Sequence, residues 1–139
     1  MIEFHYQCDF ELSNESKYTE WLKKIAQTEN SSIGTLTYIF CDDDQLLKIN
    51  KEYLDHDDFT DIITFDYGDR KIISGDVFIS KERVWENAQK FDTAGERELL
   101  RVMSHGVLHL MGYNDKTEEE RSVMREKENE KIDMFHVEQ

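Results

Sequence analysis

Proline is absent from this chain of 139 residues, and glycine occurs only six times. Asn, Asp and these few glycines must therefore make the turns. Cysteine is also scarce. Cys8 and Cys41 stand far apart in stretches that favour strands, so we expect two reduced thiols in the core of a cytosolic protein rather than a disulfide framework.

Long apolar runs are absent too. No stretch reaches the ~20 apolar residues of a membrane span, and the first residues lack the basic and apolar segments of a signal peptide. Positive charge is in the minority, with 17 Lys and Arg against 31 Asp and Glu, a net charge of −14. A protein this acidic cannot bind nucleic acid through its overall charge, so such a role would need a local basic patch or a metal ion. We expect a cytoplasmic protein without a membrane partner.

The patterns that are present predict an α+β fold. Alternating apolar residues and β-branched runs indicate four strands, and helical spacing of apolar residues indicates five helices. The predicted order is β-α-β-α-β-β-α-α-α, which gives a small mixed sheet packed with helices. We interpret residues 1–139 as a single domain.

Two capping boxes mark predicted helix starts, at residues 93–96 and 117–120. The helix after the first box carries apolar residues around much of its circumference, which is typical of a central, buried helix. His105 and His109 lie on this helix.

Those two histidines are four residues apart, so a helix places them on one face, where one metal ion can bind both. Gly112 allows the left-handed backbone that ends a helix, and Asp115 can then return to the same ion. Two nitrogens and one oxygen leave a fourth position for a metal-bound water, as in catalytic zinc sites.

The histidine pair alone has two readings. A buried histidine is often only hydrogen-bonded in a core, and for the pair alone we weigh this evenly against metal binding. The glycine and the third donor beyond it favour metal, because some zinc sites take their third ligand from beyond a turn. Gly106 stands where a zinc protease carries its glutamate base, which argues against peptide hydrolysis.

Residues 105–113, His-Gly-Val-Leu-His-Leu-Met-Gly-Tyr, resemble the signature of the YbeY family of metal-dependent endoribonucleases. Two upstream blocks are similar to further motifs of that family, in the same order. The first block comprises Ile49, Asn50, Tyr53, Asp57 and residues 60–65, and the second comprises residues 75–79.

The resemblance implies an endoribonuclease that acts on single-stranded RNA in rRNA maturation and ribosome quality control, with ribosomal RNA and the ribosome or assembly factors as partners. It implies one divalent ion per chain, with Zn²⁺ expected, held by His105, His109 and Asp115. The chain departs from the family at two relevant positions. The usual third ligand is histidine where this chain has Asp115, and Leu54 replaces an arginine thought to contribute to activity.

Two other residues are candidates near the ion. Arg101 lies one turn before His105 and could contact phosphate, and an ion pair with Glu96 or Glu98 is an equally good reading. Asp76 could orient a ligand histidine, although a role in a turn or bulge is slightly favoured.

Two alternatives to the nuclease remain open. One is a non-catalytic ribosome-assembly factor with a structural metal, which Leu54 and the net charge of −14 favour somewhat. The other is a zinc hydrolase of another substrate.

Overall fold

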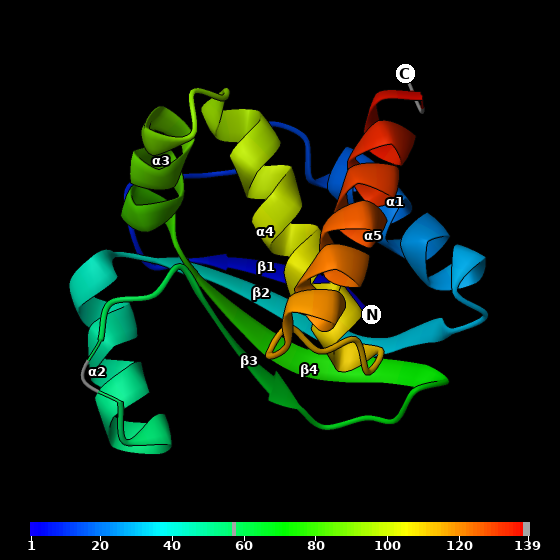
Figure 1. The fold of residues 1–139 in the computed structure, drawn as a ribbon, viewed down its shortest axis with the longest axis horizontal. Coiled ribbons are helices and arrows are strands. Elements are labelled where there is room, and N and C mark those ends of the chain that lie inside the picture. The colour runs from blue at the N-terminus through cyan, green and yellow to red at the C-terminus, as the bar shows by residue number, and fades with distance from the viewer. Residues whose placement is uncertain (57, 138–139) are drawn as a thin grey trace.

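The structure is a computed structural model that describes residues 1–56 and 58–137. The element order is the predicted one, and its α+β class is confirmed (Figure 1). The elements are β1 (Ile2–Tyr6), α1 (Glu15–Thr28), β2 (Ser32–Cys41), α2 (Asp43–Leu54), β3 (Ile62–Asp66), β4 (Ile72–Ser80), α3 (Lys81–Lys90), α4 (Gly95–Leu110) and α5 (Glu118–Val137).

The four strands form one mixed sheet in the order β1-β2-β4-β3. β1, β2 and β4 are parallel, and β3 pairs antiparallel with β4. Side chains of successive strand residues point to opposite faces, so both faces can be covered. α1, α4 and α5 pack over one face with the main core beneath them, and α2 covers a smaller core on the other (Figure 1).

α4 is the central helix, as its sequence predicted. Most of its residues are buried, and Leu99, Met103 and Val107 belong to the main core. A Cβ on Gly106 would lie 2.9 Å from Cγ1 of Val77 and 3.0 Å from Cδ1 of Ile62. The glycine therefore lets α4 approach β3 and β4 closely.

The two predicted capping boxes have different outcomes. The box at residues 93–96 is wrong, because the N-cap of α4 is Ala94, whose side chain accepts no hydrogen bond. The next residue, Gly95, sits against the Trp85 ring, where a Cβ would come within 2.4 Å of Nε1, so packing fixes this helix start.

The second box is confirmed. The backbone N–H of Glu120 donates to Oγ1 of Thr117 at 3.0 Å, and the N–H of Thr117 donates to Oε1 of Glu120 at 2.9 Å. This reciprocal pair anchors the start of α5 and the end of the α4–α5 loop, residues 111–117, which carries Asp115.

The two cysteines differ in burial. Cys41 is buried at the end of β2, and burial raises the pKa of its thiol to about 12. Cys8 is only half-buried, beyond the end of β1. Among the described residues, no helix has the length and apolar character needed to cross a membrane.

Candidate metal centre

The histidine pair lies on the last two turns of α4. The ring centroids of His105 and His109 are 5.0 Å apart, and the two side chains are 20% and 31% exposed. They are thus set among core residues yet open toward solvent on one side. The predicted placement on one helix face is confirmed.

Asp115 reaches both histidines after the chain reverses. Gly112 has a φ of +104°, a left-handed conformation that side-chain-bearing residues rarely adopt. Beyond it, Oδ2 of Asp115 lies 3.2 Å from Nε2 of His105, and Oδ1 lies 3.4 Å from Nε2 of His109. The turn predicted at Gly112 therefore returns Asp115 to the histidine pair.

The donor atoms suit a single divalent ion. One ligand atom from each residue lies within 4.8 Å of the others. Two ligands about 2.1 Å from one ion at a tetrahedral angle are about 3.4 Å apart, which matches the two nitrogen–oxygen distances. Two imidazoles and one carboxylate form a donor set that zinc accepts, so the chemistry of these residues fits a metal ion.

Glu128 on α5 is a functional residue that the sequence interpretation missed. Its Oε2 lies 2.7 Å from Nδ1 of His105, and its side chain is only 6% exposed. The carboxylate accepts a hydrogen bond from Nδ1–H, which leaves Nε2 directed toward Asp115. Burial alone would lower the pKa of His105, but the hydrogen bond and charge of Glu128 outweigh it and raise the pKa.

Arg101 holds the other side of Glu128. Its Nη1 donates to Oε1 of Glu128 at 3.0 Å, and its Nη2 donates to Asn129 at 2.9 Å. The predicted ion pair thus exists with a partner on α5, and not with Glu96 or Glu98. A phosphate contact of Arg101 stays a prediction.

Asp76 does not orient a ligand histidine. Its Oδ2 accepts a hydrogen bond from the hydroxyl of Tyr67 at 3.1 Å, while Glu128 takes the place beside His105. β4 carries Asp76 into a pair with Phe65 of β3, at the end of the sheet where the hairpin turns.

A cleft of about 980 Å³ opens beside the three donors. Its walls come from the end of α2, the segment leading into β3, α4, the α4–α5 loop and α5. Leu54 at the end of α2 lines it together with Phe59. Asp57, part of the same sequence block, lies outside the described residues.

Two further acidic residues line this cleft, the partly buried Asp61 and the buried Glu98. Burial raises the pKa of Asp61, whose nearby charges include His105, and burial raises the pKa of Glu98 on α4. Glu98 is 6% exposed. The lining of the cleft contains five carboxylic acids, Asp58, Asp61, Glu98, Asp115 and Glu128, against the three cations Arg101, Lys116 and Arg125, and this excess of acidic residues favours a bound cation.

The family model described as "Endoribonuclease YbeY" matches residues 4–136. A relative of that name from Flavobacterium johnsoniae is 52% identical over 139 residues, covering all of both chains. Another, from Bacteroides fragilis, is 49% identical over 116 residues, covering 84% of each chain.

The fold has a counterpart among solved structures. A solution structure of a protein from Thermotoga maritima superimposes with a TM-score of 0.71 at 26% identity. The match covers 99% of this chain and 91% of the other. The likeness therefore includes the sheet, the central helix and the segments that form the cleft.

Proposed function

Because this chain belongs to the endoribonuclease YbeY family, we propose that it is a metal-dependent endoribonuclease that cleaves single-stranded RNA during rRNA maturation. The observation that carries the proposal is the cluster of His105, His109 and Asp115 at the wall of an open cleft, in a chain with this family assignment. We propose that residues 1–139 work as one domain.

The side chains have separable roles in this proposal. His105 and His109 present Nε2 to the ion, and Asp115 adds a carboxylate oxygen from the loop. Glu128 keeps the proton of His105 on Nδ1 and so fixes the ring for binding. A divalent ion held there would polarise a phosphoryl oxygen and activate water near neutral pH.

We propose Zn²⁺ as the ion, one per chain. Two imidazole nitrogens and one carboxylate oxygen match catalytic zinc sites, which keep a position open. Replacing a third imidazole with a carboxylate makes the donor set harder, so Mn²⁺ is the first competitor to test.

The proposed partners follow from the substrate. Ribosomal RNA is the substrate, and the ribosome or its assembly factors are the setting in which the RNA is met. We place the protein in the cytoplasm because ribosomal RNA matures there in bacteria, the source of the relatives that match this chain.

RNA cleavage by zinc-reconstituted protein tests the proposal, with His109→Ala as the inactive variant and His5→Ala as control. His5 is a 54% exposed histidine on β1, outside the cleft. We expect His109→Ala to lose at least about a hundredfold in cleavage rate and His5→Ala to retain it. Equal cleavage by His109→Ala would reveal a contaminating nuclease and contradict the proposal. RNA binding without any cleavage would favour the assembly-factor alternative.

A further inference from the structure

The walls of the cleft differ in charge, and we propose that Arg125 is the residue that grips the RNA phosphate beside the metal donors. This inference rests on the proposed nuclease function, because it assigns the cleft to a single-stranded RNA backbone. It also departs from the sequence interpretation, which placed the phosphate contact at Arg101.

Arg101 already makes hydrogen bonds to other side chains. It donates to Glu128 at 3.0 Å and to Asn129 at 2.9 Å, and its side chain is 17% exposed. Drawing it toward a phosphate would leave the carboxylate of Glu128, 6% exposed, without its closest cation. Loss of one partner of a buried ion pair is strongly unfavourable, so Arg101 is poorly placed to exchange partners.

Arg125 can move at little cost. Its side chain is 59% exposed, and its Nη1 lies 3.8 Å from Oε1 of Glu128, beyond hydrogen-bond distance. When Arg125 turns to a phosphate, Glu128 keeps both Arg101 and His105 as partners. A planar guanidinium then offers two parallel N–H donors to two phosphate oxygens.

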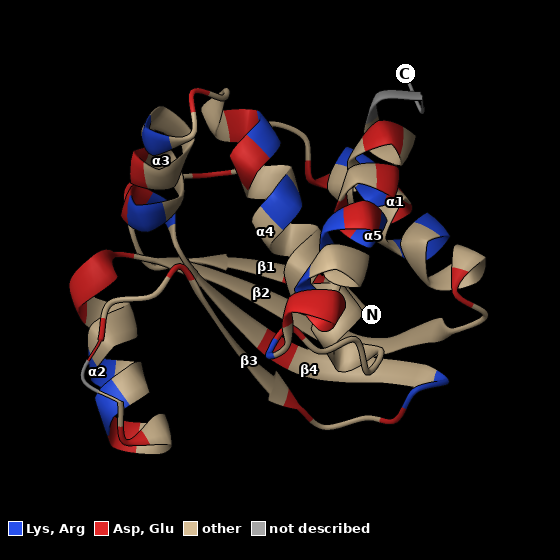
Figure 2. Cartoon of the chain, viewed as in Figure 1, with Lys and Arg blue, Asp and Glu red and all other residues tan. Residues whose placement is uncertain are grey.

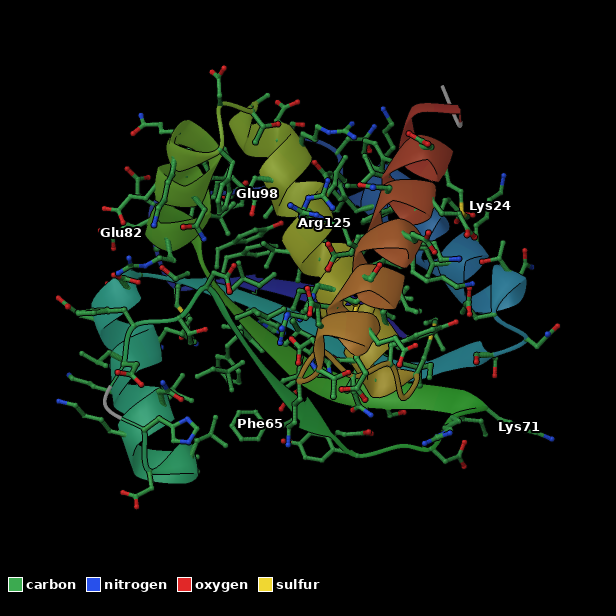
Figure 3. The ribbon with its side chains drawn as sticks, in the orientation of Figure 1. Lys24, Phe65, Lys71, Glu82, Glu98 and Arg125 are labelled. Carbon is green, nitrogen blue, oxygen red and sulfur yellow. The ribbon has the colours of Figure 1, made fainter. Side chains whose placement is uncertain are left out.

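The position of Arg125 also suits this role. It lines the main cleft and a second cavity of about 280 Å³, both of which are also lined by His105 and Asp115. Among the described residues, it is the one arginine or lysine that lines both. Figure 3 shows Arg125 on the side of α5 toward α4, near Glu98.

On the opposite wall, none of the described residues that line the cleft is a lysine or an arginine. Leu54 and Phe59 line it, with exposed fractions of 43% and 51%, beside the exposed His56 and Asp58. With a net charge of −14, the protein repels RNA at long range, so a phosphate must be held by positive charge at the site itself. Arg125 provides that charge within the same cleft as the metal donors.

RNA binding and zinc binding, measured on the same variants, test this assignment. A short fluorescein-labelled single-stranded RNA of mixed sequence is titrated with metal-free protein, in chelator, and followed by anisotropy. The variants are Arg125→Ala, Arg125→Lys and the control Lys71→Ala. Lys71 is an exposed cation in the β3–β4 turn, outside both cavities (Figure 3).

We expect Arg125→Ala to raise the RNA Kd about tenfold, with Arg125→Lys in between and Lys71→Ala close to the unaltered protein. The slope of log K against log salt should shrink by about 0.7 in Arg125→Ala, the value for one contact to a single strand. Zinc affinity should stay within about twofold, because Arg125 is not the main partner of Glu128.

Two results of the binding measurements would overturn the inference. One is an RNA Kd for Arg125→Ala equal to that of Lys71→Ala. The other is a parallel loss of zinc affinity, which would show that Arg125 acts through Glu128. Cleavage assays on the same proteins separate this inference from the proposed function. If the unaltered protein and Arg125→Ala cleave RNA with equal kcat/KM, only the inference about Arg125 is wrong. If RNA binding depends on Arg125 but no cleavage occurs, only the proposed nuclease function is wrong.

Discussion

Glu128 links the metal donors to the rest of the cleft at the level of single residues. One carboxylate oxygen accepts a hydrogen bond from His105 and the other accepts one from Arg101, so both oxygens have a partner. Such a carboxylate partner fixes the tautomer and orientation of a metal-binding imidazole. The candidate site therefore includes a residue from another helix in addition to its three predicted ligands.

Replacing Glu128 with glutamine should weaken zinc binding by 10- to 100-fold, the usual effect of removing a partner of a ligand histidine. The neutral amide keeps the shape of the side chain but loses the charge that faces His105 and Arg101. Zinc affinity is measured by competition with a chromogenic chelator.

The control for this substitution is Glu126→Gln, on the exposed face of the same helix. It removes one charge without touching the histidine pair. If Glu128→Gln binds zinc as tightly as Glu126→Gln does, the orienting role assigned to Glu128 is wrong.

The cluster of His105, His109 and Asp115 could be predicted from the sequence because a helix and one turn bring these residues together locally. His105 and His109 are four residues apart, and Gly112 allows the reversal to Asp115. Glu128 could not be predicted in this way. It lies thirteen residues beyond Asp115 on a helix rich in acidic residues, and only the packing of α5 against α4 singles it out.

At the level of elements, the candidate metal centre depends on how closely α4 approaches the sheet. Gly106 sits directly between the two donor histidines in sequence and faces β3 and β4. The side chain of alanine would meet Val77 at 2.9 Å and Ile62 at 3.0 Å. Either these two side chains or α4, with the histidines that it carries, would then have to shift.

Gly106→Ala should therefore lower the free energy of unfolding by roughly 1 to 3 kcal/mol, despite the better helix propensity of alanine. Urea denaturation measures this change. Adding Val77→Ala removes one of the two close contacts, so the double variant should be less destabilised than the sum of the two single variants. Strict additivity of the two changes would contradict the proposed close contact.

A buried ionic network ties α1, the α4–α5 loop and α5 together. Glu29 at the end of α1 accepts hydrogen bonds from Tyr113, Lys127 and Lys131. Lys131 is fully buried. Burial alone would raise the pKa of Glu29, but the three donors outweigh it and lower the pKa to about 2. The network thus holds the loop of Asp115 against the body of the protein.

Glu29→Gln should destabilise the protein at pH 7 by roughly 1.5 to 3 kcal/mol, because the buried Lys131 loses one of its two carboxylate partners and keeps only Glu130. The folded pKa of Glu29 is below its ordinary value of 4.5, so its contribution is complete above that pH and is lost as the pH falls toward 2. Urea denaturation across this range should show a flatter pH dependence in the variant.

Glu20→Gln is the matched control, since Glu20 is 66% exposed on the same helix and pairs with Lys23 at 3.7 Å. It should change stability by less than about 1 kcal/mol. An equal pH dependence of the unaltered protein and Glu29→Gln would contradict the pKa shift.

The elements themselves could be predicted because their periodicities are strong. The order and types of all nine predicted elements agree with the described residues. The start of α4 could not be read from local signals, since Trp85 packs against Gly95 there in place of a side-chain cap. The same holds for the Glu29 network, whose members are far apart in the chain.

The molecule as a whole is strongly acidic, and its acidic residues are widely spread (Figure 2). The first turn of every helix carries at least one, where it interacts favourably with the helix dipole. Around the cleft the same charge favours a divalent cation and opposes RNA. To bind RNA, this molecule therefore needs a metal ion and a local arginine to offset its negative charge.

Calorimetric titration of chelator-treated protein with Zn²⁺ tests the central claim, that His105, His109 and Asp115 hold one ion. We expect one ion per chain in the unaltered protein, and a loss of that binding in His109→Ala, with His5→Ala unchanged. The account would be contradicted if the unaltered protein gave no heat of binding. It would also be contradicted if His109→Ala bound Zn²⁺ with the same stoichiometry and affinity as the unaltered protein.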